Sequence, residues 1–292
     1  MFEGFEERTI EANGAKHFFR VGGTGSPLLL LHGYPQTHVA WHDLAPLLAK
    51  YFQVILPDLR GYGNSVGPED DSEHEAYSKR TMAHDAIEIM KSLGHAKFAI
   101  CGHDRGGRVA YRAALDHPSI ITHVIAIDIV PTLVLWERMD QKVALSTFHW
   151  PFLAQPAPLP ESLIAKEPDL WVQTLIDRWI GKGNSLTEDA VRSYKKQFHN
   201  AESLSATCAD YRAGVTSDIE HDREDRAQDR KIKCPTLIVW GEQFLNSRSG
   251  DILGIWEEWA ETVSGLPLDC GHFVAEEKPE ELASAITTFL MP

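Results

Sequence analysis

Residues 97–118, KFAICGHDRGGRVAYRAALDHP, decide the fold. The apolar run KFAIC predicts a buried strand, GGRVAYRAALDHP predicts a helix, and GHDRG is the tight turn between them. A turn of this kind needs small residues at both ends, here Gly102 and Gly106, because its strained backbone lifts the middle side chain clear of the sheet. The lifted residue is Asp104, whose carboxylate becomes the candidate nucleophile.

An aspartate at the tip of this elbow selects a class of reaction. A carboxylate is ionised at neutral pH and attacks saturated carbon without a base to deprotonate it. We therefore expect alkyl halides or epoxides as electrophiles, with an alkyl-enzyme ester as the intermediate. The alternative interpretation is a glycine-rich turn whose aspartate only caps the following helix.

Strands and helices alternate along the chain before and after the elbow. The pair Asn13-Gly14 predicts a hairpin between strands at 8–12 and 16–21. The other elements expected before residue 130 are strands at 27–32, 52–57, 97–101 and 122–128 and helices at 39–50, 79–93 and 105–116. This alternation is typical of a mostly parallel sheet covered by helices on both faces.

The alternation stops at Pro131 and resumes after about residue 230. Helix-like stretches and a proline-rich bend fill the interval, and the charged run HDREDRAQDRK at 221–231 is predicted to be solvated helix or linker. Beyond it we expect a strand at 236–240, a helix at 251–260, a strand at 263–266, a loop at 269–273 and a helix at 279–290. The predicted fold class is α/β, with a helical cap (131–230) inserted between two parts of the core (1–130 and 231–292).

Two further residues complete a candidate triad. His272 lies in the loop before the last helix, and a base after the nucleophile and the acid is the chain order expected with a nucleophile elbow. Asp128 ends the apolar run VIAID, at the carboxyl end of a strand beside the elbow, where ligand sites of open α/β sheets lie. The competing position after 236–240 offers Glu242 and no aspartate before Asp251. We therefore assign His272 as the base and Asp128 as the acid.

An oxyanion hole is expected from two backbone N–H groups. One belongs to Arg105, directly after the nucleophile, and the other to Tyr34 in the loop HGYP that follows the strand at 27–32. The Tyr34–Pro35 bond is a candidate cis peptide.

Composition and charge narrow the partners. The chain has 292 residues, of which 43% are hydrophobic and 24% charged, as in an ordinary globular protein with a sizeable core. Its formal net charge of −14 disfavours nucleic acid as a partner, because binding phosphates needs a basic surface. A small anionic substrate would be repelled at long range, so it would require a local arginine cluster.

The compartment is inferred from the N-terminus, the apolar runs and the cysteines. The start MFEGFEERTIEANG is acidic and lacks the pattern of a secretory signal, and the apolar runs are too short or too polar to cross a bilayer. Cys101, Cys208, Cys234 and Cys270 form no C-x-x-C pair. We expect a cytoplasmic protein with free thiols, no membrane partner and neither a disulfide framework nor a zinc site.

At this point the sequence resembles the fluoroacetate (haloacetate) dehalogenases of the α/β-hydrolase superfamily, over nearly the whole chain. The matching segments are DLRGYGNS at 58–65, YSKRTMAHD at 77–85, GHDRGGRVAYRAALDHP at 102–118, DIVPT at 128–132, FHWPF at 148–152 and GHF at 271–273. The resemblance implies an α/β-hydrolase fold, hydrolysis of haloacetates without metal or organic cofactor, and a homodimer.

The resemblance also implies roles for five side chains. Arg105 and Arg108 would hold the substrate carboxylate, which matches the planar fork of arginine. Three donors would replace the water around the departing fluoride: His149, Trp150 and Tyr211. Pro151 favours a helix end at His149-Trp150. Without the resemblance, FHWPF would be interpreted as core of the cap and Tyr211 as helix packing.

Two other functions remain open. An epoxide hydrolase would share the Asp104 nucleophile and would need tyrosines such as Tyr194 and Tyr211 to protonate the epoxide oxygen, although Arg105 after the nucleophile suits a carboxylated substrate better. Haloalkane dehalogenases carry a tryptophan where this chain has Arg105. A non-catalytic binding protein of the same fold is the second alternative, and it predicts the loss of a triad residue.

Overall fold

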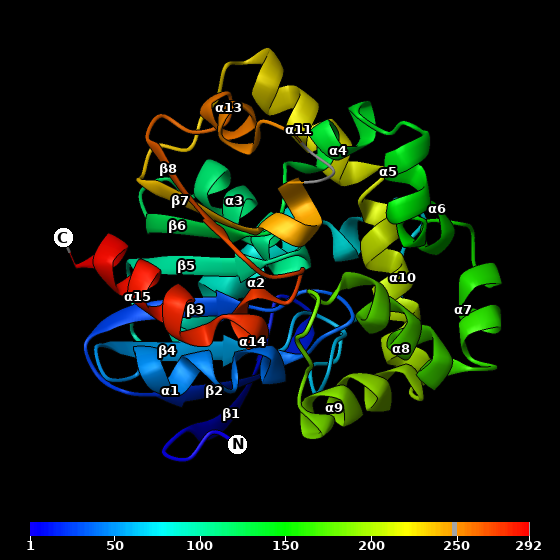
Figure 1. Cartoon of the computed structure of the whole chain (residues 1–292), viewed down its shortest axis with the longest axis horizontal. Coiled ribbons are helices and arrows are strands. Elements are labelled where there is room, and N and C mark those ends of the chain that lie inside the picture. The colour runs from blue at the N-terminus through cyan, green and yellow to red at the C-terminus, as the bar shows by residue number, and fades with distance from the viewer. Residues whose placement is uncertain (247–249, 292) are drawn as a thin grey trace.

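The computed structural model describes residues 1–246 and 250–291, and its centre is an eight-stranded sheet (Figure 1). The strand order is β1-β2-β4-β3-β5-β6-β7-β8. The strands are β1 (Glu6–Ala12), β2 (Ala15–Gly22), β3 (Ser26–Leu31), β4 (Phe52–Pro57), β5 (Phe98–His103), β6 (Ile121–Ile127), β7 (Thr236–Gly241) and β8 (Val263–Leu268). β2 pairs antiparallel with both β1 and β4, and the pairs from β4 to β8 are parallel. The mostly parallel sheet with an antiparallel edge is confirmed.

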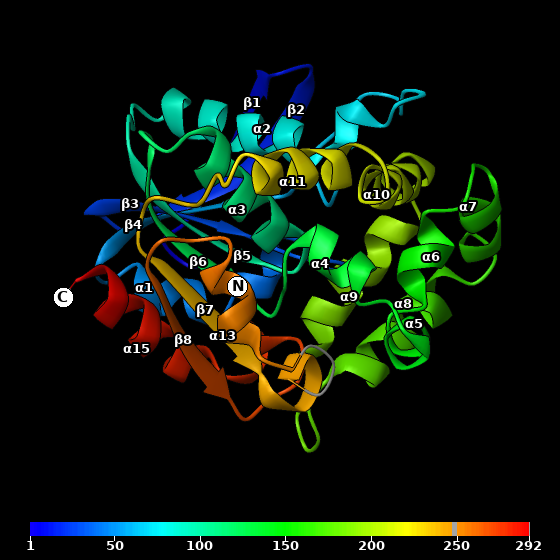
Figure 2. The ribbon, with the colours of Figure 1, turned by 90° about the horizontal axis from the view of Figure 1, so that it is seen from above.

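Helices cover both faces of this sheet, as Figure 2 shows from above. Helices α2 (Lys79–Ser92) and α3 (Arg105–Asp116) lie on one face, and α1 (Leu44–Leu48) and α15 (Pro279–Leu290) lie on the other. Every residue of β5 is buried, as expected for a central parallel strand that is covered on both sides. Shorter elements complete the core: η1 (His38–Trp41), η2 (Glu75–Tyr77), η3 (Glu242–Asn246), α13 (Ile252–Glu257) and α14 (Val274–Glu277).

The segment between β6 and β7 is helical, and most of it lies beside the carboxyl ends of the strands (Figure 1). We call its helices the cap helices: α4 (Thr132–Glu137), α5 (Gln141–Ser146), α6 (His149–Leu153), α7 (Leu159–Ile164), α8 (Pro168–Trp179), α9 (Glu188–Phe198), α10 (Ala201–Ala213) and α11 (Ser217–Ala227). Residues 132–227 are all described and contain no strand. The last cap helix, α11, runs back over the core beside α3 (Figure 2).

The helix expected at 39–50 is wrong in its continuity. The structure has the short turn η1 and then α1, separated by His42 and Asp43. Pro46 explains the break, because a proline inside a helix lacks an N–H and its ring clashes with the carbonyl four residues earlier, here that of His42. The helix expected at 251–260 is also shorter than predicted: it is α13, capped by the side chain of Asp251.

The charged run at 221–231 is less solvated than predicted. Asp222 and Asp225 on α11 are buried, at 1% and 0% exposure, and both pair with Arg112 on α3. Asp222 also accepts hydrogen bonds from the hydroxyl of Tyr111 and the backbone N–H of Leu133. The run therefore contains buried acceptors that attach α11 to the core, beside the exposed charges that its composition indicates.

The four cysteines carry free thiols. Cys101, Cys208 and Cys270 are buried, and Cys234 is partly buried. Burial raises the pKa of the Cys234 thiol to about 11, so this thiol stays protonated at neutral pH. In the described parts of the chain, no helix combines the length and the apolar character that crossing a bilayer requires.

Candidate active site

The elbow places Asp104 in a strained conformation between β5 and α3. Its φ of +46° and ψ of −113° lie outside the regions that non-glycine residues favour. The two glycines of the motif are sterically required. A Cβ on Gly102 would lie 2.2 Å from the carbonyl oxygen of Gly106, and a Cβ on Gly106 would lie 2.3 Å from that of Leu31. The chain can therefore make this turn only with small residues, and the turn presents the Asp104 carboxylate at the end of the sheet.

One carboxylate oxygen of Asp104 is held by the loop after β3. The backbone N–H of Tyr34 donates a hydrogen bond of 3.0 Å to Oδ2 of Asp104. The Tyr34–Pro35 peptide is cis, as expected. The loop approaches the elbow so closely that a Cβ on Gly33 would lie 2.5 Å from the Cβ of Asp104. This contact holds Oδ2 of Asp104 at a backbone donor, while Oδ1 does not take part in it.

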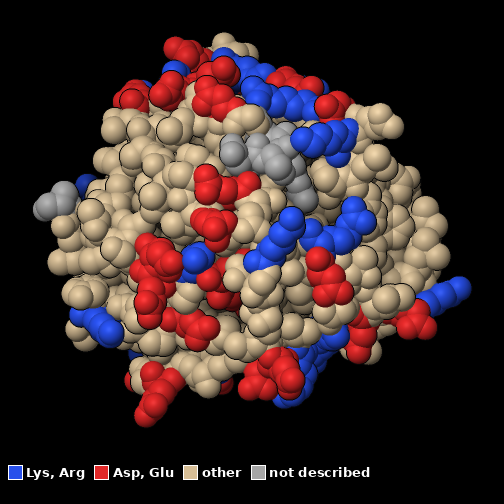
Figure 3. All heavy atoms as spheres, viewed as in Figure 1, with Lys and Arg blue, Asp and Glu red and all other residues tan. Residues whose placement is uncertain are grey.

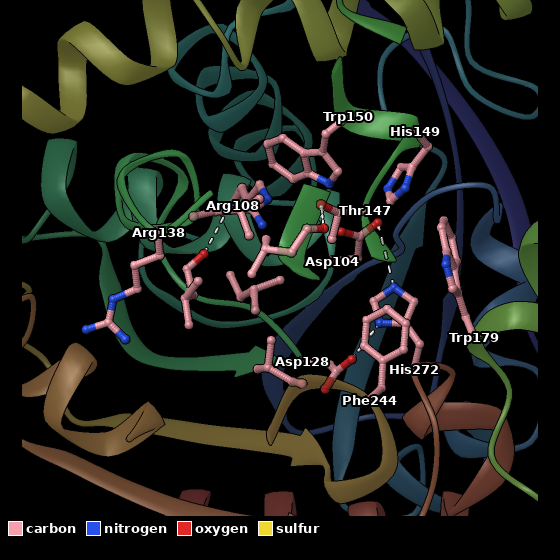
Figure 4. Close-up of a pocket in the computed structure, with 15 residues that line it drawn as sticks. Asp104, Arg108, Asp128, Arg138, Thr147, His149, Trp150, Trp179, Phe244 and His272 are labelled. Atoms are coloured by element: carbon pink, nitrogen blue, oxygen red, sulfur yellow. Dashed lines mark hydrogen bonds and ion pairs between the residues drawn. The ribbon is translucent and has the colours of Figure 1, made fainter. Parts of the chain in front are cut away.

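The structure brings His272 and Asp128 together beside the elbow (Figure 4). His272 Nδ1 lies 2.5 Å from Oδ2 of Asp128, and Oδ1 of Asp128 accepts a hydrogen bond of 2.9 Å from the backbone N–H of Gly241. A carboxylate at Nδ1 fixes the proton on that nitrogen, so Nε2 carries a lone pair. Nε2 lies 4.0 Å from Oδ2 of Asp104, which is too long for a direct hydrogen bond.

Nearby basic groups keep the candidate nucleophile, Asp104, ionised. Burial by itself would raise the pKa of Asp104, but His272, His103, Arg108 and Arg105 together hold this pKa below its ordinary value. The carboxylate is therefore present in its charged, nucleophilic form throughout the neutral range.

A small buried cavity of about 50 Å³ opens at Asp104 (Figure 4). Residues of the core and of the cap helices line it: Asp104, Arg108, Asp128, Ile129, Val130, Leu135, Arg138, Val143, Thr147, His149, Trp150, Trp179, Phe244, Leu245 and His272. Six of the residues predicted from the sequence lie in this wall. The backbone of Tyr34 contacts Asp104 behind it, and Arg105 and Tyr211 are not among the lining residues.

Arg108 supplies a positive charge to the cavity wall. Its Nη1 donates hydrogen bonds to the carbonyl of Val130, at 3.0 Å, and to Oγ1 of Thr132, at 3.1 Å. Its guanidinium lies 4.4 Å from the ring centroid of Trp150, within the range of a cation–π contact. Burial and the neighbouring charge of Arg105 lower its pKa, and no described residue accepts a hydrogen bond from its buried Nε. The group is a cation with donor capacity left for an anion.

Arg105 is occupied by a partner that the sequence did not indicate. Its Nε and Nη2 donate to the two carboxylate oxygens of Asp210 on α10, at 2.9 and 2.6 Å, and Nη2 also donates to the Asp210 carbonyl. Lys79 and Tyr62 bind the same carboxylate. Of the guanidinium nitrogens of Arg105, only Nη1 has no hydrogen-bond partner among the described residues. Arg105 therefore offers at most one nitrogen to a ligand.

Aromatic side chains of the cap form a cluster over the two arginines. His149 and Trp150 begin α6, at the helix end that Pro151 predicted, and Tyr211 lies on α10. The ring of Tyr211 lies 5.4 Å from that of Trp150 and 5.7 Å from that of His149. The Arg105 guanidinium lies 4.2 Å from the Tyr211 ring. The Tyr211 hydroxyl is buried and has no hydrogen-bond partner among the described residues.

The sequence interpretation missed several residues of the wall. Trp179 lies under His149 and His272, with ring centroids 4.6 and 5.4 Å away, and its carbonyl accepts a hydrogen bond of 2.8 Å from the backbone N–H of His272. Phe244 packs on the other side of the His272 ring at 4.3 Å. Arg138 is exposed and lies at an end of the cavity away from the triad (Figure 4). No local motif marks these residues, because each reaches the site only through tertiary packing.

The surface as a whole carries charges of both signs. On the face in Figure 3, acidic side chains are scattered over the core half, while several basic side chains lie toward the half formed by the cap helices. On this face, charges of opposite sign are thus unevenly distributed.

The comparisons with known proteins agree with this geometry. Residues 26–279 match the family model of the alpha/beta hydrolase fold, and the chain belongs to this family. It is 38% identical over 291 residues to a fluoroacetate dehalogenase of Burkholderia sp, covering 99% of this chain and 95% of that protein. It is also 34% identical over 285 residues to a soluble epoxide hydrolase of Corynebacterium sp. (strain C12), covering 96% and 95%. These similarities identify it as a hydrolase of the α/β family.

Among solved structures, the fold is similar to that of ALR0039, a putative alpha/beta hydrolase from Nostoc sp PCC 7120. The TM-score is 0.97 at 45% sequence identity, and the match covers 100% of this chain and 99% of that chain. The likeness includes the cap helices, because it extends over the whole chain.

Proposed function

We propose that the protein hydrolyses haloacetates, converting fluoroacetate to glycolate and fluoride. The observation that carries this proposal is that the Asp104 carboxylate and the Arg108 guanidinium share the wall of one buried cavity. A carboxylate nucleophile attacks alkyl carbon, and a buried arginine offsets the repulsion that two carboxylates would otherwise exert on each other. A neutral substrate would have no need of this cation.

In the first step, Oδ1 of Asp104 attacks the carbon that carries the halogen. A carbon–oxygen bond forms, the carbon–halogen bond breaks, and the electron pair leaves with the halide, so no proton moves. Arg108 holds the substrate carboxylate, with Nη1 of Arg105 as a second donor. His149, Trp150 and Tyr211 are the proposed donors to the departing halide, which is strongly hydrated in water.

In the second step, water attacks the ester carbonyl of Asp104. Nε2 of His272 takes the proton of this water, and Asp128 stabilises the positive charge that develops on the ring. Nε2 of His272 lies 4.0 Å from Oδ2 of Asp104, so a water molecule beside this line is within reach of both the base and the ester carbonyl. The backbone N–H of Tyr34 is already at Oδ2, and with that of Arg105 it forms the proposed oxyanion hole.

The size of the cavity also favours a small substrate. A water molecule needs about 10–15 Å³ of cavity volume, so a cavity of about 50 Å³ accepts only a few non-hydrogen atoms. A haloacetate has five of them. An aryl epoxide has more, and it would require the cap helices to move.

Epoxide hydrolysis is the second candidate, favoured by the similarity to a soluble epoxide hydrolase. The nucleophile would be the same, but an acid must protonate the epoxide oxygen. Of the two tyrosines considered for this role, Tyr194 donates its hydroxyl proton to Glu276 at 2.9 Å, which leaves Tyr211 as the candidate. The test is to measure fluoride release from fluoroacetate and diol formation from a panel of epoxides with the same preparation. Diol formation without halide release from any haloacetate would replace the first proposal.

We also propose that the protein is a cytoplasmic homodimer whose ligand is a small anion, with neither nucleic acid nor a membrane as a partner. Four leucines of the cap helices and their connections support an interface, because they are largely exposed: Leu145 at 65%, Leu159 at 49%, Leu163 at 49% and Leu170 at 63%. Leu163 and Leu170 line one hollow together with Phe148, Phe152 and Trp171, and contiguous apolar patches often mark contacts between proteins. Light scattering of the purified protein tests the dimer, and a monomer at all concentrations would exclude it.

A further inference from the structure

A series of side-chain hydrogen bonds, here called the polar chain, reaches the backbone carbonyl of His272. It begins at Tyr194 on α9, whose hydroxyl donates to Oε1 of Glu276 at 2.9 Å. Nε2 of the Gln36 amide lies 2.6 Å from Oε2 of Glu276, and Oε1 of the same amide lies 3.0 Å from Nδ1 of His103. Finally, Nε2 of His103 lies 2.8 Å from the backbone carbonyl of His272. These contacts connect the cap to the backbone of the proposed base.

The number of protons in this chain follows from the donors and acceptors. The His272 carbonyl only accepts, so Nε2 of His103 must carry a proton. A neutral imidazole has a single N–H, and Nδ1 of a neutral His103 must then accept a proton from the NH₂ group of Gln36. This arrangement requires the Gln36 amide to be turned by 180° from its orientation in the structure, so that its carbonyl faces Glu276. Because Tyr194 donates to one carboxyl oxygen of Glu276, the other oxygen must carry a proton and donate it to Gln36.

The chain has one alternative with the same number of protons. With the Gln36 amide as it stands in the structure, the same protons give a His103 imidazolium and a Glu276 carboxylate, and every hydrogen bond is again satisfied. Burial opposes both charges. His103 is 2% exposed, and burial together with the nearby His272 lowers its pKa to about 4. Burial raises the pKa of Glu276 to about 8, although its bonds to Tyr194 and Gln36 act in the other direction.

The groups around Glu276 reinforce the neutral form. Asp43 and Glu277 are the acidic neighbours that raise its pKa further. Asp43 is itself paired with Nε2 of His42 at 3.1 Å, so His42 adds no free positive charge at Glu276. Tyr194 is neutral, because burial raises its pKa well above the ordinary value. Among the contacts of the described residues, Glu276 faces no cation that could stabilise it as a carboxylate.

We propose that Glu276 is a neutral carboxylic acid whose proton completes this hydrogen-bond chain, and that Glu276 and His103 are positioning residues for His272. The role of His272 as the base rests on the proposed function. The chain holds the carbonyl of His272, while the carbonyl of Trp179 holds its backbone N–H. With both sides of the residue fixed, the ring stays between Asp128 and Asp104. Loss of the Glu276 proton would leave two acceptors facing each other and release the carbonyl.

The neighbouring Glu277 provides a matched control. Its Oε2 accepts hydrogen bonds from the N–H groups of Gly181 and Gly271 and from the amide of Asn184, and its Oε1 accepts from the N–H of Phe273. Four donors require a group that only accepts. A glutamine can replace a neutral glutamic acid at 276, donating to Gln36 and accepting from Tyr194, whereas at 277 its NH₂ would face N–H donors.

The first measurement is infrared difference spectroscopy of the wild type against E276Q, which does not depend on activity. We expect a carboxylic-acid C=O band in the wild type at pH 7 that is missing in E276Q and that titrates away with a midpoint near pH 8. Absence of this band at pH 7 would show that Glu276 is ionised and would overturn the proposal, whatever the substrate of the protein.

The second measurement is the pH profile of chloroacetate turnover. We expect kcat of the wild type to fall above about pH 8, whereas E276Q keeps its neutral-pH kcat within about twofold and loses the alkaline decline, because its chain cannot ionise. E277Q should lose thermal stability instead. An alkaline decline that persists unchanged in E276Q would also overturn the proposal. If no haloacetate is turned over but the infrared band is present, the proposed function fails and the protonated Glu276 stands.

Discussion

Asp210, on a cap helix, binds Arg105, the residue that directly follows Asp104, with both of its carboxylate oxygens. Both side chains are fully buried. The pair links α10 to the first turn of α3, and Asp210 holds the pKa of Arg105 well above its ordinary value in spite of the burial that would lower it. The cap is therefore attached to the elbow itself by a buried charge pair.

The first prediction concerns this attachment. Asp210→Asn should destabilise the protein by about 3–5 kcal/mol, because it leaves the buried charges of Arg105 and Lys79 without their shared partner. Urea unfolding measures the change. Asp189→Asn is the control, since Asp189 forms an exposed pair with Arg192 and its loss should change stability very little. Equal effects of the two substitutions would contradict a structural role of the Asp210 pair.

The second prediction tests Arg108 as the partner of the substrate carboxylate. Arg108→Lys should lower kcat/KM for chloroacetate by roughly tenfold to a hundredfold, because lysine lacks the planar fork and the charged hydrogen bonds are worth about 1.5–3 kcal/mol. Chloroacetamide, which has no carboxylate, separates this loss from general damage. A similar loss on both substrates would remove Arg108 from carboxylate recognition.

The third prediction concerns Trp150. Trp150→Phe should impair turnover of fluoroacetate more than that of chloroacetate, because fluoride has the greater need of hydrogen-bond donors when it leaves. The substitution also weakens the contact with the Arg108 guanidinium, but that damage affects both substrates alike. The ratio of the two specificity constants is the measurement, and an unchanged ratio would indicate that Trp150 serves only as core of the cap.

The fourth prediction concerns the covalent intermediate. Of the proposed triad, alkylation needs only Asp104, whereas hydrolysis of the ester also needs His272. His272→Asn should therefore release about one fluoride per active site and then stop. Mass spectrometry should find a carboxymethyl group on Asp104. In the wild type, a single turnover in heavy-oxygen water should label Asp104 and leave the glycolate unlabelled. Label that entered glycolate directly would mean that water attacks the substrate and that Asp104 acts only as a base.

The fifth prediction concerns stability and pH. Folding raises the pKa of Glu276 from 4.5 to about 8. Between these values the unfolded chain releases a proton that the folded protein keeps, so the free energy of unfolding falls as the pH rises and levels off above about pH 8. E276Q lacks this loss. Its stability relative to the wild type should therefore increase between pH 5 and pH 8 in urea unfolding, and a constant difference would contradict a raised pKa.

Local sequence determined the elbow, because its requirement is contained in five consecutive residues. Only small side chains permit the turn at Gly102 and Gly106, and the middle residue of the five must point away from the sheet, so the position of Asp104 follows directly. The alternation of strands and helices was readable for a similar reason, since each element has its own hydrophobic period. The helix expected at 39–50 is wrong because Pro46 interrupts it in spite of its helical hydrophobic period.

Tertiary structure alone decided which groups meet. Nothing near Asp210 indicates that its partner is Arg105, more than a hundred residues earlier, because packing of α10 against α3 makes the pair. Glu276 and Glu277 are adjacent and identical in type, yet one faces a hydroxyl and an amide while the other faces four N–H donors. The environment of a buried carboxyl group is set by whichever donors and acceptors the fold brings to it, and these come from distant parts of the chain.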